Sequence, residues 1–95
     1  MERNMDLREV KKKINESRVS KLQVELFNWN GDEDESGFDL MVNLLDSNED
    51  LLEDMVVIIY KQEEETKAQA EAKKIHKNLA EHYTWMEVKY TETHE

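Results

Sequence analysis

Apolar side chains occupy every second position in two neighbouring segments of this 95-residue chain. They are Leu22, Val24 and Leu26 in residues 19–29, and Phe38, Leu40, Val42 and Leu44 in residues 38–45. A period of two is typical of a strand with one buried face, because successive side chains in a strand point to opposite faces. The two segments therefore predict a pair of strands whose shared apolar face must be covered by another layer of the protein.

A third strand is predicted over residues 55–60, which are apolar on both faces and rich in β-branched side chains. Residues 46–48 break the preceding strand, and we expect a single helical turn that reaches Leu52 before the third strand begins. The apolar spacing within residues 47–62 also fits a helix, and that alternative stays open.

Two segments have helical periodicity. The first begins at Asp6, which can cap a helix together with Glu9 three residues later. The second is predicted over residues 66–83, with Thr66 and Gln69 as a capping box. The apolar stripes are Leu7, Val10 and Ile14 in the first, and Ala68, Ala72, Ile75, Leu79 and Tyr83 in the second.

Residues 85–90 alternate again and predict a last strand, after which we expect residues 91–95 to be frayed. The element order is therefore αβββαβ. We predict one α+β domain over residues 1–95, with a mainly antiparallel sheet and both helices packed on one face. The last strand should run parallel to the third, because the second helix returns the chain between them.

Acidic residues are concentrated in the segment that holds the first three strands. Residues 22–60 contain eleven carboxylates and no Lys or Arg, in a chain of net charge −10. Most fall into two clusters in the connections between strands, namely Asp32, Glu33, Asp34 and Glu35, and then Asp46, Glu49, Asp50, Glu53 and Asp54. Such a charge steers binding toward basic partners and argues against direct binding to nucleic acid or to an anionic membrane.

The sequence predicts neither catalysis nor a cofactor. There are no cysteines, and residues 32–37 lack the ligand spacing of an EF-hand, so we expect no metal site. His76 and His82 are six residues apart and do not share a helix face. No run is long and apolar enough to span a membrane, and the first ten residues lack the apolar core of a signal peptide. We therefore expect a non-enzymatic protein in the cytoplasm of the producing or host cell.

Many carboxylates on a rigid fold can imitate the phosphate array of a nucleic acid. We predict that the two acidic clusters bind a basic surface on a nucleic-acid-binding protein and thereby inhibit it. The alternative is a structural or assembly module, possibly a homodimer, that uses Phe27, Trp29 and Trp85 as its contact.

The order of helix, three strands and helix resembles the double-stranded RNA-binding domain. Lys67, Lys73, Lys74 and Lys77 lie on the second helix, where that family places basic residues, whereas the acidic residues 32–35 stand where it uses a basic loop. In size, acidity, lack of cysteine and element order, the chain also resembles small phage-encoded anti-CRISPR proteins of the type II-A kind. Those αβββα proteins block the DNA-binding site of an RNA-guided nuclease, so this resemblance implies a phage anti-defence inhibitor.

Overall fold

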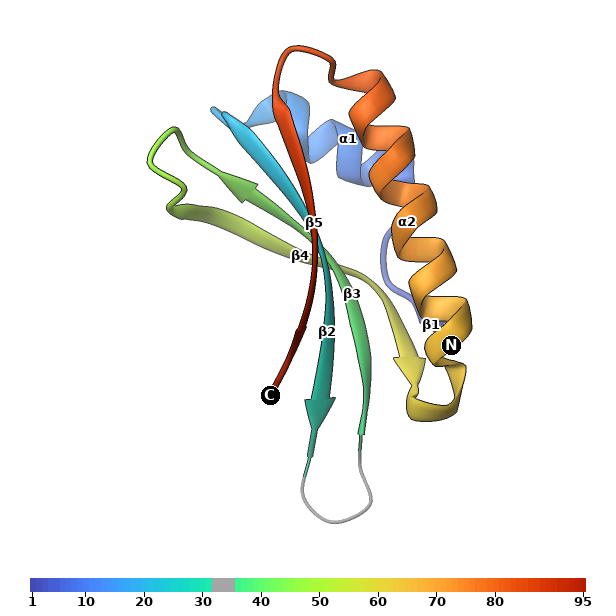
Figure 1. Ribbon diagram of the computed structural model, residues 1–95. Coiled ribbons are helices and arrows are strands. Elements are labelled where there is room, and N and C mark those ends of the chain that lie inside the picture. Colours follow the sequence, from blue (N-terminus) through green and yellow to red (C-terminus); the bar gives the residue numbers. More distant parts are fainter. Residues whose placement is uncertain (32–35) are drawn as a thin grey trace.

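The structure is a computed structural model that describes residues 1–31 and 36–95. Two helices cover one face of a five-stranded sheet with the strand order β1-β4-β3-β2-β5 (Figure 1). The elements are β1 (Glu2–Arg3), α1 (Leu7–Glu16), β2 (Lys21–Asn30), β3 (Ser36–Leu45), β4 (Leu51–Lys61), the 3-10 turn η1 (Gln62–Glu64), α2 (Glu65–His82) and β5 (Glu87–His94). The predicted α+β class and the order αβββαβ are confirmed, with the short β1 in addition.

The core lies between the sheet and the helices. β2 and β3 pair antiparallel along their whole length, which places Val24 opposite Val42 and Leu26 opposite Leu40 on the same face. These four side chains are at most 1% exposed. The helices cover them with Val10 and Ile14 of α1 and with Ala68, Ala72, Ile75 and Leu79 of α2. The apolar residues at every second position of β2 and β3 therefore form one hydrophobic face of the sheet, as the sequence predicted.

The prediction for residues 46–60 needs two corrections. The helical alternative for residues 47–62 is wrong, because this segment pairs with β3 from Leu51 onward. The expected helical turn is also absent from it: β4 begins at Leu51, and residues 46–50 form a tight turn held by the Asp46 carboxylate. Pairing with β3 extends the strand into a locally polar sequence, because tertiary contacts override local propensity.

The prediction that residues 91–95 are frayed is wrong as well. β5 runs to His94 and pairs in parallel with β2, and the Glu95 N–H donates to the Asn28 carbonyl over 3.0 Å. β5 does run in the same direction as β4, as predicted. However, α2 carries the chain across the whole sheet, so that β5 lies beside β2 and at the opposite edge from β4.

The start of α1 is as predicted and the start of α2 is not. The Asp6 carboxylate caps α1 by accepting from the Glu9 N–H at 2.8 Å. α2 begins at Glu65, directly after η1, and the Glu64 carboxylate accepts from the Lys61 N–H at 2.9 Å. The expected Thr66–Gln69 capping box is wrong, because Gln69 instead donates to Glu92 of β5.

Gly37 provides a test of the sheet packing. A methyl group added there would lie 2.5 Å from the Tyr60 carbonyl oxygen and 3.1 Å from Cζ2 of Trp29. We expect Gly37→Ala to lower the free energy of unfolding by about 1–3 kcal/mol, because β3 and β4 must separate to admit the methyl group. Urea denaturation measures this value, with Ser36→Ala as a control that changes it by less than about 0.5 kcal/mol. Equal stability of the two variants would contradict this account.

Candidate functional site

Neither helix covers the second face of the sheet in the part of the chain that the structure describes (Figure 1). We call it the open face. The strand registers place on it Lys21, Gln23, Glu25, Phe27 and Trp29 of β2, Gly37, Asp39, Met41, Asn43 and Leu45 of β3, Leu51, Asp54, Val56, Ile59 and Lys61 of β4, and Glu87, Lys89, Thr91 and Thr93 of β5. These residues alternate with the core residues, so the same strands form both surfaces.

One end of the open face is apolar. Phe27 and Ile59 flank Asp39 on the neighbouring strands, Met41 lies opposite Val56, and all four apolar side chains are half-buried although no described helix packs on them. Trp29 lies beyond Phe27 on the same strand. Its indole borders a hollow of about 390 Å³ lined by Met1, Glu2, Trp29, Ser36, Ile59, Tyr60 and Lys61. The fold therefore leaves an apolar cluster with an adjacent hollow on its uncovered side.

Asp39 is a carboxylate within this apolar cluster. Its Oδ1 accepts a hydrogen bond of 3.1 Å from Nε1 of Trp29. Burial raises the pKa of Asp39 above its ordinary value of 3.8, and the hydrogen bond from Trp29 only partly opposes that shift. A cationic group brought by a partner would favour the ionised form and gain from this position.

The other end of the open face is a polar network across three strands. Asn43, which is only 5% exposed, donates from Nδ2 to Gln23 at 3.0 Å and to Glu25 at 2.9 Å. Gln23 in turn donates to Thr91 at 3.0 Å, and Thr93 donates to Glu25 at 2.6 Å. The network fixes β3, β2 and β5 together and orients the Glu25 carboxylate. The sequence analysis missed it, since its members are close only after the strands have paired.

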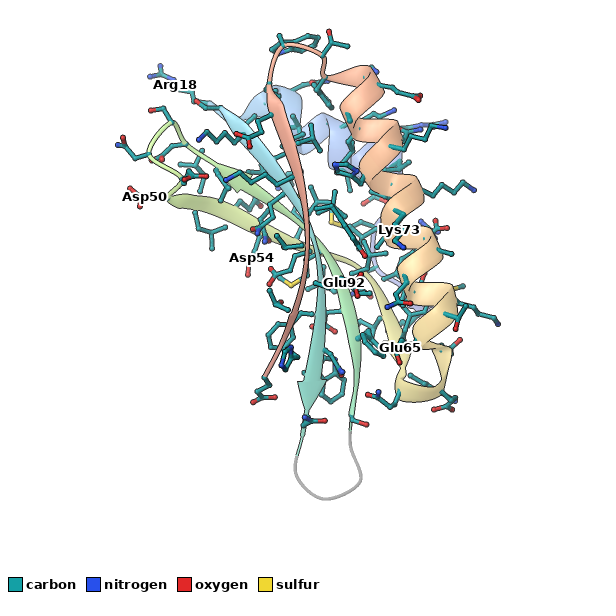
Figure 2. The ribbon with its side chains drawn as sticks, in the orientation of Figure 1. Arg18, Asp50, Asp54, Glu65, Lys73 and Glu92 are labelled. Carbon is teal, nitrogen blue, oxygen red and sulfur yellow. The ribbon has the colours of Figure 1, made fainter. Side chains whose placement is uncertain are left out.

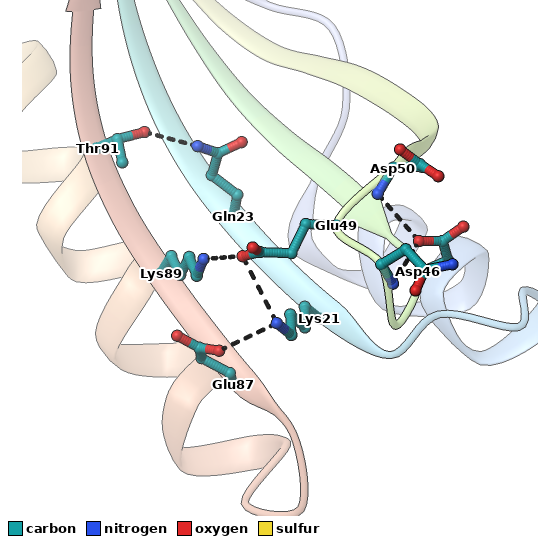
Figure 3. A network of polar contacts seen from close by, with 9 residues as sticks. Lys21, Gln23, Asp46, Glu49, Asp50, Glu87, Lys89 and Thr91 are labelled. Atoms are coloured by element: carbon teal, nitrogen blue, oxygen red, sulfur yellow. Dashed lines mark hydrogen bonds and ion pairs between the residues drawn. The ribbon is translucent and has the colours of Figure 1, made fainter.

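The second acidic cluster is largely engaged within the molecule. Glu49 forms ion pairs with Lys21 at 3.5 Å and with Lys89 (Figure 3), and the hydrogen bond from Lys89 is the main cause that lowers the pKa of the Glu49 carboxyl. Glu53 lies 3.7 Å from Lys13. Asp46 accepts from two backbone N–H groups of its own turn, at 2.8 and 2.9 Å.

The bases that engage this cluster all lie outside the acidic segment of residues 22–60. α1 supplies Lys13, the first residue of β2 is Lys21, and β5 supplies Lys89. The exposed Asp50 and Asp54 have no ion pair among the described residues. Figure 2 shows both side chains on the side of the sheet away from α2. Of the five candidate carboxylates, Asp50 and Asp54 are therefore the two whose side chains make no ion pair or hydrogen bond among the described residues.

The first acidic cluster, Asp32 to Glu35, lies outside the described residues. The strand ends that flank it, Asn30 and Ser36, are at the opposite end of the sheet from the turn at residues 46–50 (Figure 1). The described part of the predicted binding site, residues 46–54, therefore begins at the end of the sheet away from Asn30 and Ser36.

The three aromatic residues of the alternative hypothesis do not form one contact. Phe27 and Trp29 share the apolar end of the open face. Trp85 is 72% exposed in the turn between α2 and β5, with its ring centroid 5.5 Å from that of Tyr83. Since β5 starts opposite Lys21, this turn lies at the other end of the sheet from Trp29.

Comparisons with protein-family models, with curated proteins and with solved structures find no match to this chain. Among the described residues, no helix is both long and apolar enough to cross a membrane. Within the same ranges, no three His, Cys, Asp or Glu side chains are grouped so that they could hold a metal ion.

The setting of Asp39 predicts a pH-dependent stability. Its folded-state pKa is raised, so its ionisation destabilises the fold: the cost is absent well below pH 3.8, grows as the pH rises from there to the raised pKa, and is complete above that pKa. We expect Asp39→Asn, which keeps an acceptor for Trp29, to raise the free energy of unfolding near neutral pH and to lose this advantage in acid. Urea denaturation across this pH range measures both.

The matched control is Asp54→Asn, which makes the same change in net charge at an exposed position of the open face. Its effect reports the general relief of negative charge alone. An equal gain in stability from the two variants at neutral pH would contradict the role of burial at Asp39.

Proposed function

We propose that this protein is a non-enzymatic binding protein whose open face docks onto a basic surface of a partner protein. The observation that carries the proposal is an uncovered apolar cluster, Phe27, Trp29, Met41, Val56 and Ile59, with carboxylates within it and beside it. The helix side needs no partner, because its apolar residues already form the core.

Charge on the open face supports a basic partner. The face holds four carboxylates, Glu25, Asp39, Asp54 and Glu87, against three lysines, Lys21, Lys61 and Lys89. Two of these lysines, Lys21 and Lys89, already bind Glu49. A partner rich in Lys and Arg would meet Glu25, Asp39 and Asp54, which form no ion pair among the described residues, and complementary charge of this kind speeds encounter and fixes the orientation of docking.

The apolar cluster would supply the centre of such an interface. Protein interfaces concentrate binding energy in a few aromatic side chains that become fully desolvated, surrounded by a polar rim. Phe27 and Trp29 have this composition and position, and Glu25 and Asp54 lie along the margin of the cluster.

We further propose that the basic surface is one that otherwise holds DNA or RNA, so that binding is inhibitory. Carboxylates at Asp50 and Asp54, together with Asp32 to Glu35, would occupy positions that phosphates take in the partner's own complex. The size, acidity and element order that the chain shares with anti-CRISPR inhibitors support this narrower form, which makes the partner a nucleic-acid-guided or nucleic-acid-binding enzyme.

The test is a pair of charge-reversal variants with equal change in net charge. One combines Asp50→Lys with Asp54→Lys, and the control combines Glu63→Lys with Glu81→Lys, two exposed acids on the helix side. A partner captured by the wild-type protein from host lysate is purified, and its affinity for each variant is measured by calorimetry. We expect the first variant to weaken binding at least about tenfold, or about 1.4 kcal/mol, and the control to change it much less.

Competition completes the test of the inhibitory form. Wild-type protein should displace a labelled oligonucleotide from the purified partner, and added salt should weaken the protein–partner complex by screening its charges. Equal loss of affinity in the two variants would refute docking through the open face. Simultaneous binding of oligonucleotide and protein would refute inhibition by mimicry.

A further inference from the structure

A second hollow lies on the helix side of the sheet, where β1 meets α2 (Figure 1). Its volume is about 380 Å³. Three elements line it, with Arg3 from β1, Tyr60 from β4, and Lys67, Glu71 and Lys74 from α2. We call it the basic hollow, because three of these five side chains are bases.

The pairing of β1 with β4 brings Arg3 and Tyr60 to the same hollow. Arg3 lies opposite Ile58, and Tyr60 follows Ile58 by two residues. Opposite residues and alternate residues of a strand share a face, so both side chains lie on the helix side of the sheet. There, Nη1 of Arg3 donates to the Met5 carbonyl at 3.4 Å, and Nη2 lies 3.7 Å from Oε1 of Glu71. The guanidinium is therefore held between β1 and α2.

α2 supplies two further bases. Lys67, Glu71 and Lys74 have the spacing i, i+4 and i+7, which places them on one face of the helix. Glu71 pairs with Arg3, whereas Lys67 and Lys74 form no ion pair among the described residues. The hollow therefore has an excess of two positive charges, in a chain whose net charge is −10.

Tyr60 adds a hydroxyl without a partner. The residue is only 3% exposed, yet its hydroxyl forms no hydrogen bond with any described residue, and the oxygen still reaches solvent. Burial is the main cause that raises the pKa of Tyr60 above 10.0, and the charges of Glu71 and Arg3 act on it as well. The hydroxyl therefore lies near the Arg3–Glu71 pair and keeps its proton at neutral pH. A buried polar side chain without a partner is uncommon and points to a ligand that supplies one.

We propose that the basic hollow binds a small phosphate monoester. Such a phosphate carries a charge of about −1.5 to −2 at neutral pH and three acceptor oxygens. This charge matches the excess of two positive charges, and the oxygens match the donors of Arg3, Lys67, Lys74 and Tyr60. The volume of the hollow lies within the range of about 300–1,000 Å³ that is typical of small-molecule sites, so an organic group attached to the phosphate also has room.

The charge of the whole chain favours a small ligand over a strand of nucleic acid. A net charge of −10 repels a polyanion over the entire surface, whereas a single phosphate meets mainly the local field of the hollow. The three bases lie on the helix side of the sheet and not on the open face. This proposal and the proposed function can therefore fail independently.

Calorimetric titration of the whole chain with phenyl phosphate and with phenyl sulfate tests the ligand class. The two probes have the same shape, but the sulfate ester carries only one negative charge. We expect phenyl phosphate to bind at least about tenfold more tightly, and added salt to weaken its binding. Equal affinity for the two probes, or no binding of phenyl phosphate at millimolar concentration, would overturn the proposal. Tighter binding of a 5′-phosphorylated oligonucleotide than of phenyl phosphate would overturn the preference for a small ligand.

Two tyrosine variants test the role of the buried hydroxyl. Tyr60→Phe should weaken phenyl phosphate binding at least about tenfold and leave the urea midpoint unchanged, because this hydroxyl bonds to no described residue. The matched control is Tyr83→Phe, which removes a hydroxyl that donates to Asn15 at 3.0 Å. It should lower the urea midpoint and leave the affinity unchanged. The same affinity in Tyr60→Phe as in the wild-type chain would contradict the proposal.

A pair of lysine variants separates the hollow from the general charge of α2. One combines Lys67→Gln with Lys74→Gln, and the control combines Lys73→Gln with Lys77→Gln, two exposed lysines of the same helix that do not line the hollow. Both make the same change in net charge. We expect the first to weaken phenyl phosphate binding at least about tenfold and the control to weaken it less than about twofold. An equal loss in the two variants would refute binding in the basic hollow.

Discussion

The antiparallel pairing of β2 with β3 is the contact on which the rest of the structure depends. Ten residue pairs set one row of apolar side chains beside another, and a sheet with one such face cannot remain uncovered in water. α2 covers it with small residues, Ala68 and Ala72, which let the helix axis approach the strands closely. Because α2 spans the sheet from the end of β4, the chain emerges beside β2, and the position of β5 follows.

The two faces of the sheet have different roles because each strand alternates between them. Val24 and Leu26 of β2 lie in the core, whereas Glu25 and Phe27 of the same strand lie on the open face. An apolar cluster on that side adds nothing to helix packing, and a fold of this size could have used polar residues there. This cluster, together with the excess of carboxylates, is why we propose the open face as the docking surface.

The residue types of the candidate site can be read from the sequence, but the contacts among those residues cannot. The acidity of residues 46–54 is plain in the sequence, but Glu49 and Glu53 form ion pairs with bases that are distant in the chain. Asp39, by contrast, lies outside both acidic clusters of the sequence, and its carboxylate accepts a hydrogen bond from Trp29 within the apolar cluster. Counting charges along a segment cannot separate these cases, because an ion pair depends on distance in space.

The sequence by itself determined the α+β class, the order of the main elements and the residues that face the core. Periods of two and of about 3.6 are local properties, and each is imposed by the geometry of one strand or one helix. Only the tertiary structure decided that β5 continues to His94 beside β2, that residues 51–54 join β4, and that Lys21 and Lys89 meet at Glu49. The physical reason is the same in each case: these features are held by hydrogen bonds and ion pairs between segments far apart in the chain, and no local pattern encodes which distant segment will be the neighbour.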